Sequence, residues 1–267
     1  MLGAMATNGP GEVGDWDAAT YDRIADPMTR WGARVLERLP LAGDETVLDA
    51  GCGSGRVTEL LLRRLPRGHV VALDASPAML ERARERLGDA HGRVRLVLAD
   101  LLGPLAETVG EPMDAVLSTA TFHWVPDHER LFANLASAMR PGAPLVAQCG
   151  GAGNIASVRA AAARIAGRWA GSKNFATIED TERRLREAGF VDVLVWLVDE
   201  PTPMERGEPL ETYLRTICLR DQMEGMGEAE RVAFSREVAA ALPSPAIDYV
   251  RLNIVARRAG RQRRRPR

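Results

Sequence analysis

The sequence has few features of a secreted, membrane or metal-binding protein. Its three cysteines, Cys52, Cys149 and Cys218, are scattered and form no C-x-x-C pair, so neither a zinc site nor a disulfide framework is indicated. No apolar run approaches the roughly 18 residues that a membrane-spanning helix needs. A basic region followed by an apolar stretch is also lacking at the N-terminus, so we expect no secretory signal. Together these absences predict a cytoplasmic protein without a metal site.

Charge and composition narrow the class further. The formal net charge of −1 at pH 7 is unlike that of a general nucleic-acid binder, whose domain would be markedly basic. Only Lys173 among the 35 basic residues is a lysine, which we interpret as a codon bias rather than a phosphate-binding surface. A hydrophobic content of 46% in 267 residues is enough for one large α/β domain with helical insertions.

A strand, a tight glycine turn and a helix are predicted where the first apolar run ends at Asp49. Three glycines follow it at every second position: Gly51, Gly53 and Gly55. Glycine lets the backbone bend sharply and approach a ligand closely, and this order is typical of a nucleotide-binding βαβ unit. Arg56 stands where the dinucleotide motif G-x-G-x-x-G has its third glycine. The pattern therefore favours an uncharged or zwitterionic nucleoside over a pyrophosphate.

Two further predicted strands are also followed by an acid. The strand that ends at Asp74 places this residue 23 positions after Gly51, close to the spacing of a carboxylate that accepts both ribose hydroxyls. Ser76 and Pro77 then begin a helix as its N-cap and first-turn residue. A third strand precedes Asp100. One such acid could equally be a helix or turn cap, but three at the carboxyl edge of a parallel sheet indicate a ligand site.

This order of strands, glycines and acids resembles the class I S-adenosylmethionine-dependent methyltransferases. The residues that carry the resemblance are Val47–Gly55, Asp74, Asp100 and Met113–Ser118. It covers about residues 20–150 with specific motifs and continues more weakly to Arg257. The resemblance implies a Rossmann-like α/β fold with helices on both faces of a seven-stranded, mostly parallel sheet. It also implies an antiparallel last strand between the fifth and sixth, a helical cap, and S-adenosyl-L-methionine as cofactor.

The resemblance also implies a role for individual residues. The glycine loop would lie against the methionine part of the cofactor, Asp74 would bind the ribose hydroxyls, and Asp100 would receive the adenine amino group. Met79 would lie near the adenine face, where a polarisable thioether fits well. Tyr21 would help to close the site, or would equally well pack its helix on the core. The implied cofactor-binding residues are Tyr21, Asp49, Gly51, Gly53, Gly55, Asp74, Ala75, Met79, Asp100, Leu101 and Ser118.

The segment from Ser118 to His128 is the most informative about the methyl acceptor, because it leaves the fourth predicted strand at the cofactor end. Its aromatic-His-Trp-Val-Pro pattern resembles the trans-aconitate 2-methyltransferase group and related small-molecule carboxyl methyltransferases. His123 is a candidate general base near neutral pH, a donor to an acceptor carboxylate, or a packing residue. Trp124 is expected to shield the sulfonium site from water.

The remaining chain is divided by composition and periodicity. We expect a disordered N-terminus at 1–14, a methyltransferase domain at 15–258 and a basic, solvated tail at 259–267. Helical insertions at about 150–176 and 201–243 would roof the active site. Later strands are expected at 115–118, 145–149, 191–198 and 247–257, and later helices at 127–140, 155–166, 182–188, 210–220 and 228–242.

Three residues of the insertions are candidate acceptor contacts: Trp169, Arg215 and Arg220. The arginines, together with Arg168, are candidates because Arg binds carboxylates in bidentate fashion. Packing within the cap is the alternative for Trp169, and simple surface exposure is the alternative for the arginines.

The predicted activity is methyl transfer to a small molecule, with a carboxylate as the first acceptor to consider. O-, N- or C-methylation in secondary metabolism is the alternative, because the same cofactor core serves all of these acceptors. An NAD-dependent oxidoreductase and a non-catalytic nucleoside-binding protein are remote alternatives. We expect no nucleic-acid or membrane partner, and the sequence leaves the oligomeric state open.

Overall fold

The computed structural model describes residues 26–88 and 90–260. Tyr21, the predicted N-terminal segment 1–14 and residues 261–267 of the basic tail lie outside the described residues. The predicted roles of these parts of the chain therefore stay predictions.

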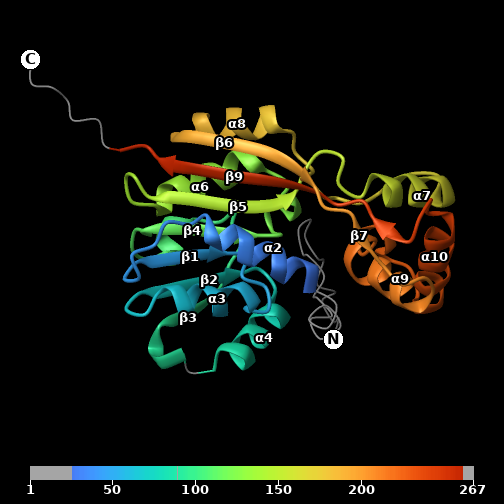
Figure 1. The fold of residues 1–267 in the computed structure, drawn as a ribbon, viewed down its shortest axis with the longest axis horizontal. Coiled ribbons are helices and arrows are strands. Elements are labelled where there is room, and N and C mark those ends of the chain that lie inside the picture. The colour runs from blue at the N-terminus through green and yellow to red at the C-terminus, as the bar shows by residue number, and fades with distance from the viewer. Residues whose placement is uncertain (1–25, 89, 261–267) are drawn as a thin grey trace, which may run out of the picture.

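A seven-stranded sheet forms the centre of the molecule (Figure 1). Its order is β3-β2-β1-β4-β5-β9-β6. The strands are β1 Thr46–Ala50, β2 His69–Asp74, β3 Val94–Leu98, β4 Ala115–Thr119, β5 Pro144–Gly150, β6 Phe190–Asp199 and β9 Val250–Arg258. Neighbours from β3 to β5 are parallel, whereas β9 runs antiparallel to both β5 and β6. This confirms the predicted sheet, including its antiparallel last strand between the fifth and sixth.

Helices cover both faces of the sheet. The helices are α2 Asp26–Glu37, α3 Arg56–Arg64, α4 Pro77–Leu87, α5 Leu105–Val109, α6 His128–Ala138, α7 Ala156–Ala166, α8 Ile178–Glu187, α9 Glu208–Tyr213 and α10 Glu228–Ala241. Successive strand residues point to opposite faces, so Val47 joins the core under α2, α3 and α4, while Leu48 joins the core under α5, α6 and α8. Both side chains are fully buried, which explains why these strands appear in the sequence as continuous apolar runs.

A helical cap of α7, α9 and α10 lies beyond the carboxyl ends of the parallel strands (Figure 1). The two insertions share one apolar core, in which Val158, Leu214 and Val238 are fully buried. Trp31 of α2 and Tyr249 also belong to this core, and their rings meet edge to face with centroids 5.1 Å apart. The cap therefore stands on the side of the sheet where the sequence predicted the ligand.

The predicted strand at 247–257 is wrong in its first part. Ala246–Ile247 form a separate strand, β8, which pairs antiparallel with β7, Thr202–Pro203, next to the cap. Asp248 turns the chain between β8 and β9, because both its carboxylate oxygens accept hydrogen bonds from Ser157 at the start of α7. In place of the predicted helix at 210–220, the α-helix α9 ends at Tyr213 and the chain continues as a π-helical turn, Leu214–Cys218.

Candidate functional site

The glycine loop after β1 is tightly bent and lies against the loop that follows β4. Gly51 and Gly53 have φ angles of +82° and +54°, a region that other residues rarely adopt. A Cβ at Gly51 would come within 2.2 Å of Oγ1 of Thr121, whose hydroxyl donates to the Gly51 carbonyl over 3.1 Å. A Cβ at Gly53 would meet no atom within 4 Å. The loop is thus closed toward Thr121 and open at Gly53, while Gly55 leads directly into α3.

Asp49 is a buried carboxylate with only one satisfied oxygen. Its side chain is 1% exposed, and Oδ2 accepts a 2.6 Å hydrogen bond from the Thr58 hydroxyl. No described residue donates to Oδ1. Burial, with some repulsion from Asp74, raises the pKa of Asp49 to about 6. A buried acceptor without a partner is costly, so this oxygen marks a place for a donor or a cation.

Asp74 is held beside the glycine loop by backbone donors. Its Oδ2 accepts from the amide of Gly53 at 2.8 Å and its Oδ1 from the amide of Ser76 at 2.9 Å. Burial raises its pKa, although these hydrogen bonds oppose the effect. A carboxylate has about four acceptor positions, so Asp74 can still accept further hydrogen bonds from a diol. The Ser76 hydroxyl accepts from the Met79 amide at 3.2 Å, which confirms the predicted helix cap.

The other predicted cofactor residues that the structure describes lie near the same edge or in the core beside it. Asp74 is in register with Leu98, the last residue of β3, so exposed Asp100 follows at the neighbouring strand end. Oδ1 of Asp100 accepts from the Leu102 amide at 2.8 Å. Met79 and Leu101 are buried, and Ala75 is exposed. The hydroxyl of buried Ser118 donates to the Ala50 carbonyl at 2.7 Å and thereby joins β4 to β1.

His123 lies in a short helical turn, Phe122–Trp124, directly after β4. The imidazole is 7% exposed, and its Nδ1 accepts a hydrogen bond from the Gly150 amide at 3.3 Å. This contact assigns the proton of the neutral ring to Nε2. Burial, followed by the positive charges of Arg251 and Lys173, lowers the pKa of His123 well below its ordinary value. His123 is therefore a neutral hydrogen-bond donor.

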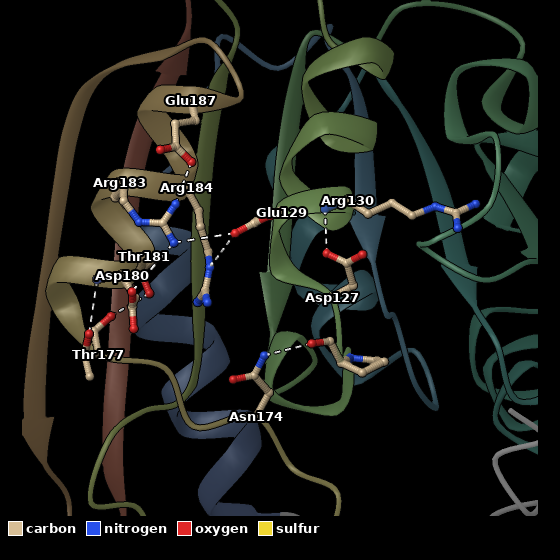
Figure 2. A network of polar contacts seen from close by, with 11 residues as sticks. Asp127, Glu129, Arg130, Asn174, Thr177, Asp180, Thr181, Arg183, Arg184 and Glu187 are labelled. Atoms are coloured by element: carbon tan, nitrogen blue, oxygen red, sulfur yellow. Dashed lines mark hydrogen bonds and ion pairs between the residues drawn. The ribbon is translucent and has the colours of Figure 1, made fainter. Parts of the chain in front are cut away.

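Contacts from Asn174 of the first insertion hold the loop that carries His123, and Figure 2 shows the surroundings of Asn174 and of the start of α6. The backbone amide of Asn174 donates to the His123 carbonyl at 2.8 Å. Its side-chain amide donates to the Pro126 carbonyl at 3.1 Å. Asp127 caps α6 through the Arg130 amide at 2.9 Å. Figure 2 also shows Arg183 of α8 reaching Glu129 of α6. Sequence reasoning missed Asn174, because no local motif marks a residue that acts across 48 positions.

Aromatic rings and cations gather around His123. We call this set the acceptor cluster: His123, Trp124, Arg159, Trp169, Lys173 and Phe175. The Phe175 ring stacks on the His123 ring with centroids 5.9 Å apart and an interplanar angle of 22°. Nζ of Lys173 lies 4.4 Å from the Trp124 centroid. The sequence indicated His123 and the two tryptophans but neither the two cations nor Phe175.

Lys173 is paired within the protein. Its ammonium forms a hydrogen-bonded ion pair with Asp221 and donates to the Cys218 carbonyl at 3.2 Å. Burial lowers the pKa of Lys173, while Asp221 opposes that effect. The pair joins the first insertion to the second, next to the Trp124 ring.

The arginines predicted as acceptor contacts occupy different places. Arg215 is half-buried and donates to the Thr212 hydroxyl at 3.3 Å. Arg220 is half-buried and precedes the helical turn that carries Asp221. Arg168 is exposed on the rim of a polar surface pocket. Their predicted contact with an acceptor remains a prediction.

Metal and thiol chemistry find little support in the described part of the chain. Residues 26–88 and 90–260 contain no group of three His, Cys, Asp or Glu side chains that could hold a metal ion. No helix within these ranges is long and apolar enough to cross a membrane. Burial, with the negative charges of Asp49 and Asp74, raises the pKa of the Cys52 thiol well above its ordinary value. Cys52 is therefore a packing residue in the glycine loop and a poor nucleophile.

Comparisons with known proteins give the class. Residues 47–142 match a family model described as a methyltransferase domain. The chain is 32% identical over 264 residues to a trans-aconitate 2-methyltransferase of Methylobacterium nodulans, covering 92% of this chain and 99% of the relative. It is 33% identical over 265 residues to the enzyme of the same name from Paracidovorax citrulli, again covering 92% and 99%.

A solved structure supports the fold independently. Phosphoethanolamine N-methyltransferase 2 of Haemonchus contortus superposes with a TM-score of 0.62 at 20% identity, covering 91% of this chain and 57% of that chain. Identity at this level supports the fold alone, whereas the relatives above match along their whole length. The chain belongs to the trans-aconitate 2-methyltransferase family of S-adenosylmethionine-dependent methyltransferases.

Proposed function

We propose that this protein transfers a methyl group from S-adenosyl-L-methionine to a carboxylate of a small organic acid and releases a methyl ester. Trans-aconitate, named for the relatives, is the first acceptor to test. The observation that carries the choice of a carboxylate is the state of His123. Its Nδ1 is already occupied by the Gly150 amide, so the ring offers a donor and no basic nitrogen.

The predicted cofactor residues fit this ligand. When bound, S-adenosyl-L-methionine supplies a methyl group on a sulfonium sulfur. Asp74 would accept the ribose hydroxyls, and Asp100 would accept the adenine amino group. The unsatisfied Oδ1 of buried Asp49 suits the positively charged amino-acid end, and the open side of Gly53 lets the ligand approach the backbone. The remaining predicted contacts are Tyr21, Gly51, Gly55, Ala75, Met79, Leu101 and Ser118.

A carboxylate acceptor makes modest chemical demands on the protein. It is ionised at neutral pH and needs no general base, so the residues around it must orient it and exclude water. Orientation alone can be worth roughly 7–11 kcal/mol of the barrier. Nε2 of His123 would donate to the acceptor carboxylate, and Trp124 would shield the reacting atoms from water. A hydroxyl, amine or carbon acid would instead need a base that His123 does not provide.

The broader parts of the proposal follow from the same features. We place the methyltransferase domain at 15–258, with its two helical insertions at about 150–176 and 201–243, in the cytoplasm. O-, N- or C-methylation of a secondary metabolite remains the alternative function. An NAD-dependent oxidoreductase or a non-catalytic binding protein would fail the first experiment below.

That experiment is calorimetric titration with S-adenosyl-L-methionine, its demethylated product and NAD, followed by mass spectrometry of trans-aconitate incubated with enzyme and methyl donor. We expect binding of the first two ligands, none of NAD, and an acid product that gains one methyl group and loses it on alkaline hydrolysis. A methyl group on trans-aconitate that survives alkaline hydrolysis would reject the carboxylate acceptor. Binding of NAD alone would reject the cofactor site.

The ribose assignment is tested by Asp74→Ala. Removing this charged acceptor should weaken cofactor binding by about 1–3 kcal/mol in calorimetry. Asp44→Ala is the matched control, because Asp44 is exposed and its one ion pair among the described residues is with exposed Arg67 over 3.7 Å. An unchanged affinity in Asp74→Ala would reject the assignment, whereas an equal loss in both variants would point to a general effect on folding.

A further inference from the structure

Arg159 on α7 is a half-buried cation that no anion balances within the described residues. Its Nε is buried and has no hydrogen-bond partner. Its guanidinium makes no hydrogen bond or ion pair with any residue in 26–88 or 90–260; its contacts there are two aromatic faces. Placing a half-buried guanidinium beside aromatic rings offsets part of its desolvation cost but gives its Nε donor no hydrogen-bond partner. Such an arrangement suits a ligand that brings its own negative charge.

The Arg159 guanidinium is connected to His123 through the Phe175 ring. Its Cζ lies 5.5 Å from the Phe175 centroid and 5.8 Å from the Trp169 centroid. Phe175 in turn stacks on His123, whose Nδ1 is fixed by the Gly150 amide. Phe175 also packs closely on this backbone, because a Cβ at Gly150 would come within 2.8 Å of the ring. Arg159 and His123 therefore both contact the Phe175 ring.

The other cation of the acceptor cluster already has its charge balanced. Lys173 pairs with Asp221 and donates to a carbonyl. The nearby Arg251 on β9 is 3% exposed, lies 4.6 Å from the Trp31 centroid and approaches the Gln148 amide oxygen at 3.5 Å. Within the cluster, Arg159 is the cation that has no hydrogen-bond or ion-pair partner among the described residues.

We propose that Arg159 determines acceptor specificity by binding a carboxylate of the acceptor that is not methylated. This inference rests on the proposed function, because it assigns the second anchor of the same site. The reacting carboxylate would receive a hydrogen bond from His123, and a guanidinium paired directly with it would lower its nucleophilicity. A cation that contacts the Phe175 ring, rather than the reacting carboxylate, holds a second carboxylate without this effect. The site therefore selects an acid that carries at least two carboxylates.

The test is steady-state kinetics of the full chain with saturating S-adenosyl-L-methionine and either trans-aconitate or its monoamides. Arg159→Met should raise KM for the acid roughly 10- to 100-fold, as expected for loss of a charged hydrogen bond, with kcat changed less than about threefold. The KM of Arg159→Lys should lie between those of wild type and Arg159→Met, because lysine keeps the charge and loses the bidentate geometry. Wild type should discriminate against one monoamide, and Arg159→Met should lose that discrimination.

Arg164→Met is the control, since Arg164 is exposed on the same helix. It should behave as wild type, and cofactor affinity should be unchanged in every variant. A wild-type KM in Arg159→Met with ester formation intact would overturn the role of Arg159 and leave the proposed function standing. Equal kinetic parameters of the wild type for the acid and for all its monoamides would overturn the role of Arg159 as well. This comparison does not depend on the folding of any variant. A wild type that forms no methyl ester would instead reject the proposed function, and this inference with it.

Discussion

At the scale of single residues, the chemical role of each polar group is set by what already contacts it. Asp49 and Asp74 are both strand-end carboxylates, yet Asp74 receives two amide donors while one oxygen of Asp49 has no described donor. His123 is a titratable residue by type, but its surroundings keep it neutral. Residue identity alone therefore suggests several roles, and the contacts choose among them.

Cofactor affinity should fall in acid because of Asp49. Burial raises its pKa to about 6, so the folded protein binds this proton more tightly than the unfolded chain does. Taken alone, the group therefore lowers folding stability as pH rises from about 4 to about 6. A positively charged ligand requires the ionised form, so its dissociation constant should rise by up to roughly tenfold per pH unit below about 6. Titration calorimetry across this range measures the slope.

The matched variant for that prediction is Asp49→Asn. It removes the charge and keeps the shape, so its cofactor affinity should be weaker near neutral pH and nearly independent of pH. If Asp49→Asn retained the full acid slope, another group would be responsible for it.

His123→Ala should lower kcat while cofactor affinity stays nearly intact, since Nε2 is proposed to contact the acceptor only. Because burial and nearby cations keep the pKa of His123 low, kcat at saturating cofactor and acceptor should show no inflection near the ordinary histidine pKa of about 6.5. A pH–rate profile of wild type and variant measures both effects. An inflection there that His123→Ala abolishes would identify the imidazole as a general base.

At the scale of elements, the loop after β4 is positioned by segments distant in sequence. Asn174 bonds its backbone, and the Lys173–Asp221 pair joins the two insertions behind Trp124. Glu129 of α6, the helix that follows this loop, forms ion pairs with Arg183 and Arg184 of α8. Strand and helix positions were predicted well, because the hydrophobic period and the capping residues of each element can be read from the local sequence. The contacts between distant segments leave no such local signal.

Breaking the Lys173–Asp221 pair should destabilise the protein strongly. The two side chains are only 3% and 14% exposed, so Lys173→Met or Asp221→Asn should each cost about 3–5 kcal/mol by leaving the partner buried and unpaired. The double variant should lose less than the sum of the single losses. Urea unfolding measures all three.

The control for the pair is Arg34→Ala, which breaks an ion pair with Glu200 whose side chains are 50% and 25% exposed. It should change stability by less than about 1 kcal/mol. Additive losses in the Lys173 and Asp221 variants would show that the two side chains act independently.

At the scale of the whole molecule, the cap is continuous with the sheet domain. Its core includes Trp31 from α2, whose indole also donates to Glu200 at the end of β6. Tyr249 enters the same core immediately before β9, and its hydroxyl lies 2.7 Å from that of Tyr213. The core of the cap thus includes side chains from α2, near the start of the described chain, and from the residue before β9, near its end.

We therefore expect cap and sheet to unfold together. Leu214→Ala in the cap and Leu135→Ala under the sheet remove fully buried side chains, and each should cost about 2–5 kcal/mol. Tryptophan fluorescence and far-ultraviolet circular dichroism should give coincident urea transitions in wild type and in both variants. A Leu214→Ala transition that fluorescence detects at lower urea than circular dichroism would show that the cap unfolds separately.

The sequence alone determined the parallel strands and the glycine loop with its acids, because strand period, turn chemistry and strand-end acids are local properties of the chain. The antiparallel direction of the last strand was implied by the family resemblance. Only the tertiary structure decided which groups surround each arginine of the insertions. Arg159, Arg168, Arg215 and Arg220 all lie in the insertions and are chemically alike. They differ in which rings, carboxylates and hydroxyls lie near them, and those neighbours are brought together by folding from positions far apart in the sequence.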